Sequence, residues 1–312
     1  MQIVHTHSRG FRPIIMDYIC NDCPRRCNAL RRDFSGNGFC RSGSLPNIVR
    51  AAPHHGEEPC ISGTNGSGAI FFSGCNLHCV FCQNHEISRM PTGKMIDESN
   101  FIDMLFRLQE LNVHNINLVT PSHHIRFISQ CLGKVKLNIP VVWNSSGYES
   151  VDMLKQLEGL VSIYMPDYKY GISSTAEKYS MAKDYPSVAK EAIQEMFRQV
   201  GPFKIDENGL MKSGVIIRHL ILPGELENSK IVIDWVSSEY HLNDVLFSLM
   251  SQYTPISENY STEYKNLSRS INNREKNVLL NYMKDCGITN GYYQSLESST
   301  KDMIPKFDGT GV

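Results

Sequence analysis

The sequence lacks the features that mark membrane-spanning and secreted proteins. No apolar run in its 312 residues approaches the roughly 20 that a helix needs to cross a bilayer. The first ten residues carry His5, His7 and Arg9 with no apolar stretch behind them, which is not the pattern of a secretory signal. We therefore expect a soluble, cytoplasmic protein with no membrane partner.

The sequence also lacks an excess of charge of either sign. Its 31 Lys and Arg residues nearly balance its 32 Asp and Glu residues, which gives a formal net charge of −1. Such a balance supplies no broad cationic field, so we expect no nucleic-acid partner. Hydrophobic residues make up 41% of the chain and charged residues 20%, a composition typical of a globular protein rather than a disordered one.

Cysteine, by contrast, is abundant and unevenly distributed. Eight of the ten cysteines lie in the first 82 residues, and seven of these form two groups with short spacings. The first group is Cys20, Cys23, Cys27 and Cys40, and the second is Cys75, Cys79 and Cys82. Cysteines of a cytoplasmic protein stay reduced, so the two groups predict metal binding or catalysis rather than disulfides.

Apolar patterning divides the chain into three parts. Residues 1–60 are irregular and rich in proline, which predicts a cysteine-rich extension without a core of its own. Residues 61–255 alternate helical patterns with short apolar runs, which lie at 69–73, 115–120, 140–144, 161–165, 214–222 and 244–250. Residues 256–312 are polar apart from a helical pattern at 275–284, and we expect this helix and tail to pack on the core.

The central part predicts an α/β fold. Strands that alternate with helices indicate βα units and a parallel sheet. Six such units suit an open, partial barrel or a doubly wound sheet, and the absence of a seventh and eighth unit argues against a closed barrel of eight. The clearest helix covers 97–111, where Asp97 and Ser99 stand at the start as capping residues.

The second cysteine group has the strongest chemical signature. It follows the first apolar run of the central part, and Gly74 between them permits a tight turn. The carboxyl end of a strand in a parallel α/β protein is where ligands bind. Three thiolates can hold three irons of a [4Fe–4S] cube and leave the fourth iron open to another ligand. The alternative is zinc, which needs a fourth ligand such as His78 or His85.

This CxxxCxxC motif, with Phe81 before its last cysteine, resembles that of the radical S-adenosylmethionine (SAM) superfamily. More narrowly, the chain resembles the iron–sulfur proteins described as homologues of pyruvate formate-lyase-activating enzyme. The likeness runs from about residue 14 to the C-terminus and rests on FFSGCNLHCVFCQNHEIS, NLVTPSHH, VVWNSSGYE, YMPDYKYG, RHLILPG, MSQYTP and IPKFDGTGV. It implies that residues 61–255 form a partial (β/α)6 barrel of the radical SAM type.

The resemblance implies an oxidoreductase that cleaves SAM reductively at a [4Fe–4S] cluster on Cys75, Cys79 and Cys82. The resulting 5′-deoxyadenosyl radical would abstract hydrogen from a substrate that the sequence does not identify. The implied partners are a one-electron donor such as flavodoxin or ferredoxin and, in the activating-enzyme subclass, a glycyl-radical enzyme. A modifier of small molecules or peptides is the rival within the enzyme class. A non-catalytic Fe–S electron carrier or a zinc-structured interaction protein is the alternative outside it.

The resemblance also implies which side chains meet SAM. Lys169 is expected to bind the SAM carboxylate, with Asp167, Asn144 and Ser145 as polar contacts that also accommodate a monovalent cation. At the second strand the chain departs from the family, because residues 118–124 contain no Gly-Gly-Glu segment and offer Thr120 instead.

The remaining expected cofactor contacts are Phe81 in the cysteine loop and His219 on the fifth strand. His219 follows Arg218 directly, and neighbouring side chains of a strand point to opposite faces. Only one of these two residues can therefore face the interior of the barrel.

The first cysteine group has the number and approximate spacing of a closed four-thiolate site. Zinc would make it a structural knuckle, whereas iron would make it an auxiliary cluster that relays electrons. Cys60, with His54 and His55 nearby, is a substitute ligand. We expect a metal at this second site and leave its identity open.

Overall fold

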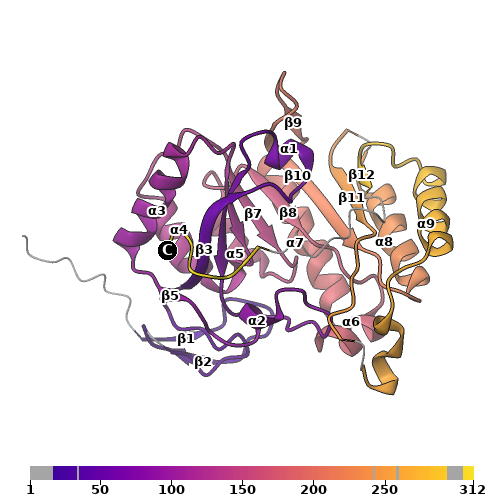
Figure 1. Cartoon of the computed structure of the whole chain (residues 1–312), viewed down its shortest axis with the longest axis horizontal. Coiled ribbons are helices and arrows are strands. Elements are labelled where there is room, and N and C mark those ends of the chain that lie inside the picture. The colour runs from indigo at the N-terminus through magenta and orange to yellow at the C-terminus, as the bar shows by residue number, and fades with distance from the viewer. Residues whose placement is uncertain (1–16, 34, 242, 258–259, 294–304) are drawn as a thin grey trace, which may run out of the picture.

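The computed structural model describes residues 17–33, 35–241, 243–257, 260–293 and 305–312. Within these ranges the centre of the molecule is one mixed sheet of ten strands (Figure 1). Its parallel strands are β4 (Ser67–Phe72), β6 (Ile116–Val119), β7 (Val141–Ser145), β8 (Ile163–Pro166), β10 (Met211–Leu220), β11 (Leu246–Met250) and β12 (Gly291–Tyr293). The six predicted apolar runs therefore form strands, with ends that differ from the prediction by a few residues.

The order of these strands decides between the two predicted architectures. Their order across the sheet follows their order along the chain, from β4 to β12. Every crossover therefore moves in the same direction, as in a barrel, whereas a doubly wound sheet reverses direction part-way. The described sheet stays open, with β5 and β12 at its edges. The short strand β12 is a seventh parallel strand that the sequence did not predict.

The α-helices that follow residue 96 flank the curved sheet (Figure 1). They are α3 (Glu98–Glu110), α4 (Ile125–Leu132), α5 (Val151–Leu154), α6 (Ser173–Ser180), α7 (Tyr185–Val200), α8 (Leu226–Glu239) and α9 (Asn273–Asp285). Asp97 caps α3 as predicted, because its side chain accepts a hydrogen bond from the backbone N–H of Asn100 at 2.9 Å. The helical pattern interrupted at Pro186 forms two helices, since Met181 ends α6 in the left-handed conformation and Pro186 lies in the first turn of α7.

The sheet begins inside the segment that was expected to be a separate extension. Strand β3 (Asn47–His54) pairs antiparallel with β4, and β5 (Lys94–Met95) pairs with the start of β3. The expected boundary at residue 60 therefore does not separate the extension from the sheet. Upstream of β3, the strands β1 (Tyr18–Cys20) and β2 (Ala29–Arg31) form a hairpin of their own below the sheet (Figure 1).

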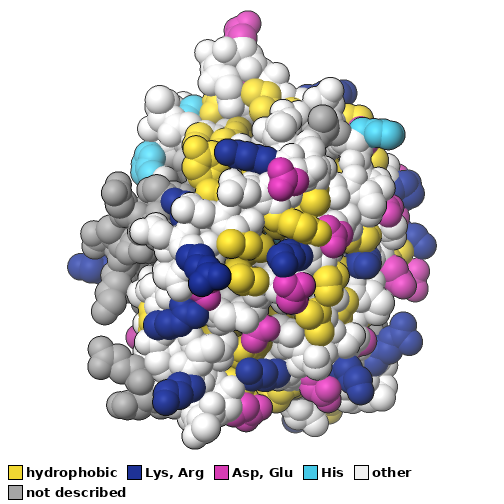
Figure 2. Space-filling view, turned by 90° about the vertical axis from the view of Figure 1, so that its right-hand side faces the viewer, with side chains coloured by type: hydrophobic (Ala, Val, Ile, Leu, Met, Phe, Trp, Pro, Cys, Tyr) yellow, Lys and Arg dark blue, Asp and Glu magenta, His cyan; other side chains and the backbone are white. Residues whose placement is uncertain are grey.

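The C-terminal residues 305–312 return to the edge of β3 that β5 leaves open. The backbone N–H of Gly309 donates to the carbonyl of Val49 at 3.1 Å, and that of Ala51 donates to the carbonyl of Thr310 at 2.9 Å. On the side of the molecule that Figure 2 shows, α9 packs on α8, and the surface carries Lys and Arg side chains interspersed with Asp and Glu. No helix among the described residues is long and apolar enough to cross a membrane.

Candidate active site

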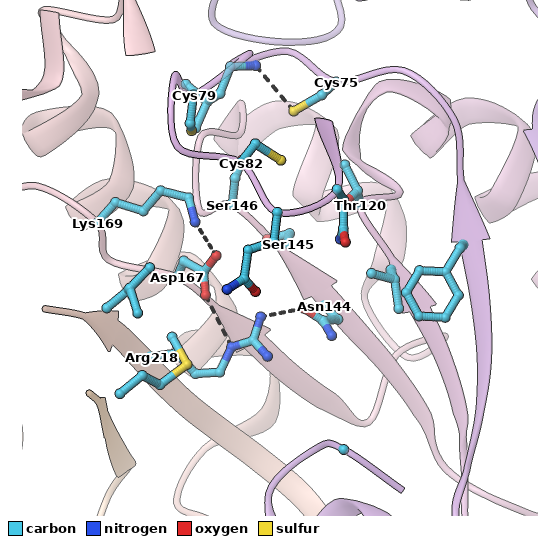
Figure 3. Close-up of a pocket in the computed structure, with 18 of the residues that line it drawn as sticks. Cys75, Cys79, Cys82, Thr120, Asn144, Ser145, Ser146, Asp167, Lys169 and Arg218 are labelled. Carbon is cyan, nitrogen blue, oxygen red and sulfur yellow. Dashed lines mark hydrogen bonds and ion pairs between the residues drawn. The ribbon is translucent and has the colours of Figure 1, made fainter. Parts of the chain in front are cut away.

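A cavity of about 270 Å³ opens at the carboxyl ends of the parallel strands (Figure 3). All three thiols of the second cysteine group line it, because the loop that carries them follows β4 directly. The predicted cofactor contacts that also line it are Phe81, Thr120, Asn144, Ser145, Asp167 and Lys169. They come from the same loop and from the ends of β6, β7 and β8. The structure thus brings together every predicted contact except His219.

The conformation of the thiol loop depends on two residues with positive φ. Gly74 has a φ of +86°, and a Cβ at this position would lie 2.8 Å from the carbonyl oxygen of Cys40. His78 has a φ of +55° and turns the chain back between Cys75 and Cys79. Glycine at position 74 therefore permits both the turn and the close approach of the N-terminal segment.

Each of the three thiols accepts a hydrogen bond from the chain. The bonds run from Leu77 N to Cys75 Sγ at 3.4 Å, from Ser180 Oγ to Cys79 Sγ at 3.0 Å, and from Ser88 Oγ to Cys82 Sγ at 3.6 Å. Such donors stabilise thiolate sulfur and tune the potential of an iron–sulfur cluster. The environment of the sulfurs therefore fits metal-bound thiolates.

Burial favours the protonated form of Cys75 and Cys82 when no cation is bound. Burial raises the pKa of Cys75 to about 12, with a further contribution from Cys79 and Cys82, and burial also raises the pKa of Cys82. Thiolates form under such conditions when a metal displaces the proton. A metal cluster would therefore displace the protons of Cys75 and Cys82.

The zinc alternative needs His78 or His85 as its fourth ligand. His78 stacks on Phe39, with ring centroids 4.5 Å apart, and neither His78 nor His85 lines the cavity. Among the described residues, no three His, Cys, Asp or Glu side chains converge on the position of a single metal ion. A [4Fe–4S] cube is wider than an ion, so three separated thiols suit it better than they suit zinc.

Below the thiols, the cavity has a floor of paired charges (Figure 3). Asp167 forms an ion pair with Lys169 and a second one with Arg218, whose Nε lies 3.1 Å from Asp167 Oδ1. Arg218 also pairs with Glu57 at 3.2 Å and donates to the side-chain oxygen of Asn144 at 2.6 Å. Arg218 therefore joins β7, β8 and β10 to the segment that follows β3.

Asp167 and Lys169 keep their charges at neutral pH. Burial raises the pKa of Asp167, but the attraction of Lys169 and Arg218 outweighs it, so the net shift is downward. Burial lowers the pKa of Lys169, but Asp167 outweighs it, so the net shift is upward. Arg218 places a guanidinium between Asn144 and Asp167, the residues expected beside a monovalent cation. We therefore do not propose that ion.

His219 does not contact the cavity, and the prediction for it is corrected. Its side chain is fully buried on the other face of β10, where Nδ1 lies 2.7 Å from the carbonyl of Tyr168 and Nε2 lies 2.8 Å from Ser229 Oγ. The carbonyl can only accept, so Nδ1 carries the proton and Nε2 accepts from Ser229. Alternation along β10 assigns the interior position to Arg218 and leaves His219 to support the Asp167–Lys169 segment from behind.

Glu57 and Gln252 are among the polar residues of the cavity that the sequence analysis missed. Glu57 accepts hydrogen bonds from the side chains of Asn117 and Asn144 at 2.9 and 3.1 Å. Gln252 lines the cavity with its buried side-chain oxygen lacking a hydrogen-bond partner in the described part of the chain. No spacing marked Glu57, which lies in a segment expected to be outside the core. Gln252 belongs to MSQYTP, one of the stretches that resemble the family, and this resemblance was the signal that could have identified it.

The four cysteines of the first group lie close together without forming a single-ion site. Cys20, Cys23 and Cys40 are buried and Cys27 is exposed. The pKa of Cys23 is raised to about 11, first by burial and then by the other three thiols. The buried Arg31 donates from Nη2 to Cys40 Sγ at 3.1 Å. Among the described residues, the side chains of this group do not converge on the position of one metal ion. The second metal site therefore stays a prediction.

Comparison with known proteins links the site to iron–sulfur chemistry. Residues 61–166, which contain Cys75, Cys79 and Cys82, match the family model described as a 4Fe-4S single cluster domain. The uncharacterized protein MJ0674 of Methanocaldococcus jannaschii is 31% identical over 265 residues, which are 82% of this chain and 71% of that protein. The chain belongs to the family of MJ0674. The domain match supports an iron–sulfur cluster in this member of the MJ0674 family.

Two solved structures are similar to this member of the MJ0674 family. One is Streptococcus suis SuiB bound to precursor peptide SuiA, which is 12% identical, has a TM-score of 0.49 and matches 74% of this chain. The other is the cobalamin-dependent SAM radical enzyme OxsB with aqua-cobalamin bound, which is 16% identical, has a TM-score of 0.35 and matches 68% of this chain. The chain spans 49% of the SuiB chain and 30% of the OxsB chain. Likeness at this level assigns neither an activity nor a substrate to the chain.

Proposed function

We propose that this protein is a radical SAM enzyme with its [4Fe–4S] cluster on Cys75, Cys79 and Cys82. When bound, the cluster and SAM together supply one-electron cleavage of SAM to methionine and a 5′-deoxyadenosyl radical that abstracts hydrogen from a substrate. The observation that carries the proposal is the shared cavity, where three hydrogen-bonded thiols lie above a lysine. Three thiols leave one iron of a cube open, which is a catalytic rather than a structural arrangement.

The chain's own residues divide the work of holding SAM. Lys169 supplies the cation for the carboxylate, and it remains charged because Asp167 raises its pKa against the effect of burial. Asn144 and Ser145, at the end of β7, supply polar groups for hydroxyls. Phe81 is buried beside the thiols and excludes water from one wall of the cavity.

Activation of a glycyl-radical enzyme is the subclass that we propose first. It rests on the resemblance of the motifs to pyruvate formate-lyase-activating enzyme, because fold and cluster do not determine a substrate. A modifier of small molecules or peptides is the second candidate.

The test of the proposed function is SAM cleavage under anaerobic conditions. The protein is reconstituted with iron and sulfide, mixed with SAM and dithionite, and 5′-deoxyadenosine is followed by chromatography. Wild type is expected to form 5′-deoxyadenosine, whereas Cys75→Ala, Cys79→Ala and Cys82→Ala should each abolish it. Cys286→Ala is the matched control, because this half-buried thiol lies outside the cavity.

The alternatives make different predictions for the same samples. A non-catalytic Fe–S carrier would retain its iron and release no 5′-deoxyadenosine. A zinc-structured interaction protein would hold zinc at the three thiols and little iron. Either result with a fully loaded wild type, when the candidate substrates are also present, would overturn the proposal.

A second metal site at Cys20, Cys23, Cys27 and Cys40 remains part of the proposal. Its support is the clustering of the four thiols and the guanidinium of Arg31 on Cys40, which would offset part of the charge of a thiolate set. Binding would require the exposed Cys27 to turn toward the three buried thiols. Whether the site holds zinc or iron is decided by metal analysis.

A further inference from the structure

The thiol loop has a second side, which faces away from the cavity. Leu77 lines the cavity with the thiols, whereas the next residue, His78, does not. The ring of His78 is half-buried, and its Nε2 has no hydrogen-bond partner in the described part of the structure. His78 therefore marks the outer edge of the loop, one residue away from Cys79.

The N-terminal segment packs on this outer side and holds the loop. Phe39 stacks on His78 with ring centroids 4.5 Å apart and an interplanar angle of 28°. The guanidinium of Arg25 lies over the Phe39 ring at 4.1 Å, and its Nε donates to the backbone carbonyl of Asn76 in the thiol loop at 2.8 Å. The half-buried groups of Arg25, Phe39 and His78 thus form a stack that packs on the loop.

Two more guanidinium groups flank this stack. Arg41 and Arg89 are exposed, and the guanidinium of Arg41 contacts the side chain of Met90, the residue that follows Arg89. Exposed methionines accompany them: Met90, 52% exposed, accepts from Arg41 at 2.7 Å, and Met181 is 56% exposed. Arginine and methionine are enriched in protein interfaces.

We name this region the outer loop surface, and it is formed by Arg25, Arg41, Arg89, Met90 and Met181 around His78. Its acidic neighbours are Glu86, exposed on α2 (His85–Ser88), and Asp184, which accepts a hydrogen bond from Tyr148. Three of the five residues that form it are arginines. On the face over α9, by contrast, charges of both signs alternate (Figure 2).

We propose that the outer loop surface is the docking site for an acidic one-electron carrier protein of the flavin or iron–sulfur class. The inference rests on the proposed function, in which each cleavage of SAM consumes one electron. The carrier is oxidised by one electron at this surface, and the cluster behind the loop is reduced by one. The arginines supply charge complementarity, and the exposed methionines supply an adaptable apolar contact.

The position of the surface favours a carrier over a substrate. Hydrogen abstraction requires a substrate to enter the cavity, which none of the residues of the outer loop surface lines. An electron needs only a close approach, and the stack of Arg25, Phe39 and His78 packs against the loop that carries Cys79. A partner seated here thus approaches the cluster without blocking the cavity.

The test uses reduced and oxidised flavodoxin as the probe and the double variant Arg41→Glu/Arg89→Glu. The control Arg274→Glu/Lys284→Glu makes the same change of net charge on exposed positions of α9. Affinity for oxidised flavodoxin is measured by calorimetry with reconstituted protein at low and high salt. We expect the loop variant to bind about tenfold more weakly or worse at low salt, the control to match wild type, and salt to remove the difference.

A second measurement separates this inference from the proposed function. 5′-Deoxyadenosine formation is compared with dithionite, which needs no docking site, and with reduced flavodoxin. The loop variant should keep the dithionite rate and lose the flavodoxin-dependent rate. If wild type forms no 5′-deoxyadenosine with dithionite, the proposed function is refuted. The flavodoxin affinities would still show whether the outer loop surface is a docking site. Equal binding by both double variants would overturn the docking site.

Discussion

Arg218 and His219 are consecutive on β10 and hold the cavity from opposite faces. Arg218 pairs with Asp167 at 3.1 Å inside the cavity, whereas His219 contacts the carbonyl of Tyr168 at 2.7 Å from behind. The two bonds fix adjacent residues of the segment that ends in Lys169. The position of the lysine under the thiols is therefore set by one charged residue and one neutral residue of a single strand.

Removing the charge of Arg218 should destabilise the fold. Arg218→Met leaves Asp167 and Glu57 buried without their shared cation, which we expect to cost about 3 kcal/mol in the free energy of unfolding. Urea unfolding of the metal-free protein measures it. The control Lys212→Met removes an exposed pair with Asp206 and should cost less than about 1 kcal/mol. Equal stability of the two variants would contradict the role of Arg218.

Neutralising Lys169 should weaken SAM binding. Lys169→Met removes a charge-assisted hydrogen bond to a carboxylate, so we expect the Kd for SAM to rise about 10- to 100-fold in reconstituted protein. Equilibrium dialysis measures the Kd directly. Lys155→Met, at an exposed lysine paired with Asp152, serves as the control and should bind SAM like wild type. An unchanged Kd in Lys169→Met would exclude the assigned contact.

The first cysteine group should bind a metal independently of the thiol loop. Cys27→Ser changes its exposed member and is expected to remove metal from the second site while the iron of the cluster on Cys75, Cys79 and Cys82 remains. Zinc and iron are counted on the same reconstituted samples, with Cys286→Ser as the matched control. If Cys27→Ser and wild type hold the same zinc and iron, the tetrad is not a metal site.

His219 should contribute a pH-dependent part of the stability. Burial lowers its pKa from 6.5 to about 4, so between these values the unfolded chain binds one proton more than the folded chain. The contribution of His219 is thus complete above pH 6.5 and is lost as pH falls, by up to about 1.4 kcal/mol per pH unit. His219→Gln should remove this part of the slope.

The readout for His219 is the difference between wild type and variant in urea unfolding from pH 7.5 to 5. A difference is needed because burial raises the pKa values of Glu58 and Glu149. These two residues make the folded state more stable as the pH falls, which is opposite to the effect of His219. Parallel stability curves for wild type and His219→Gln would show that the imidazole is not held neutral.

Local sequence determined the elements and the thiol loop. The apolar runs form β4, β6, β7, β8, β10 and β11, because buried parallel strands need continuous apolar side chains. Asp97 caps its helix through a hydrogen bond three residues away. The spacing of Cys75, Cys79 and Cys82 placed three thiols on one short loop at a strand end. These features depend on neighbours in the chain, which a sequence shows directly.

The tertiary structure alone decided which side chains meet across the cavity. Alternation allowed either Arg218 or His219 to face inward, and only the partners Asp167 and Ser229 on other elements settled the choice. Glu57 entered the cavity because β3 joined the sheet through pairing with β4. Such contacts join residues far apart in the chain, and their free energy depends on burial and on partners that spacing does not encode.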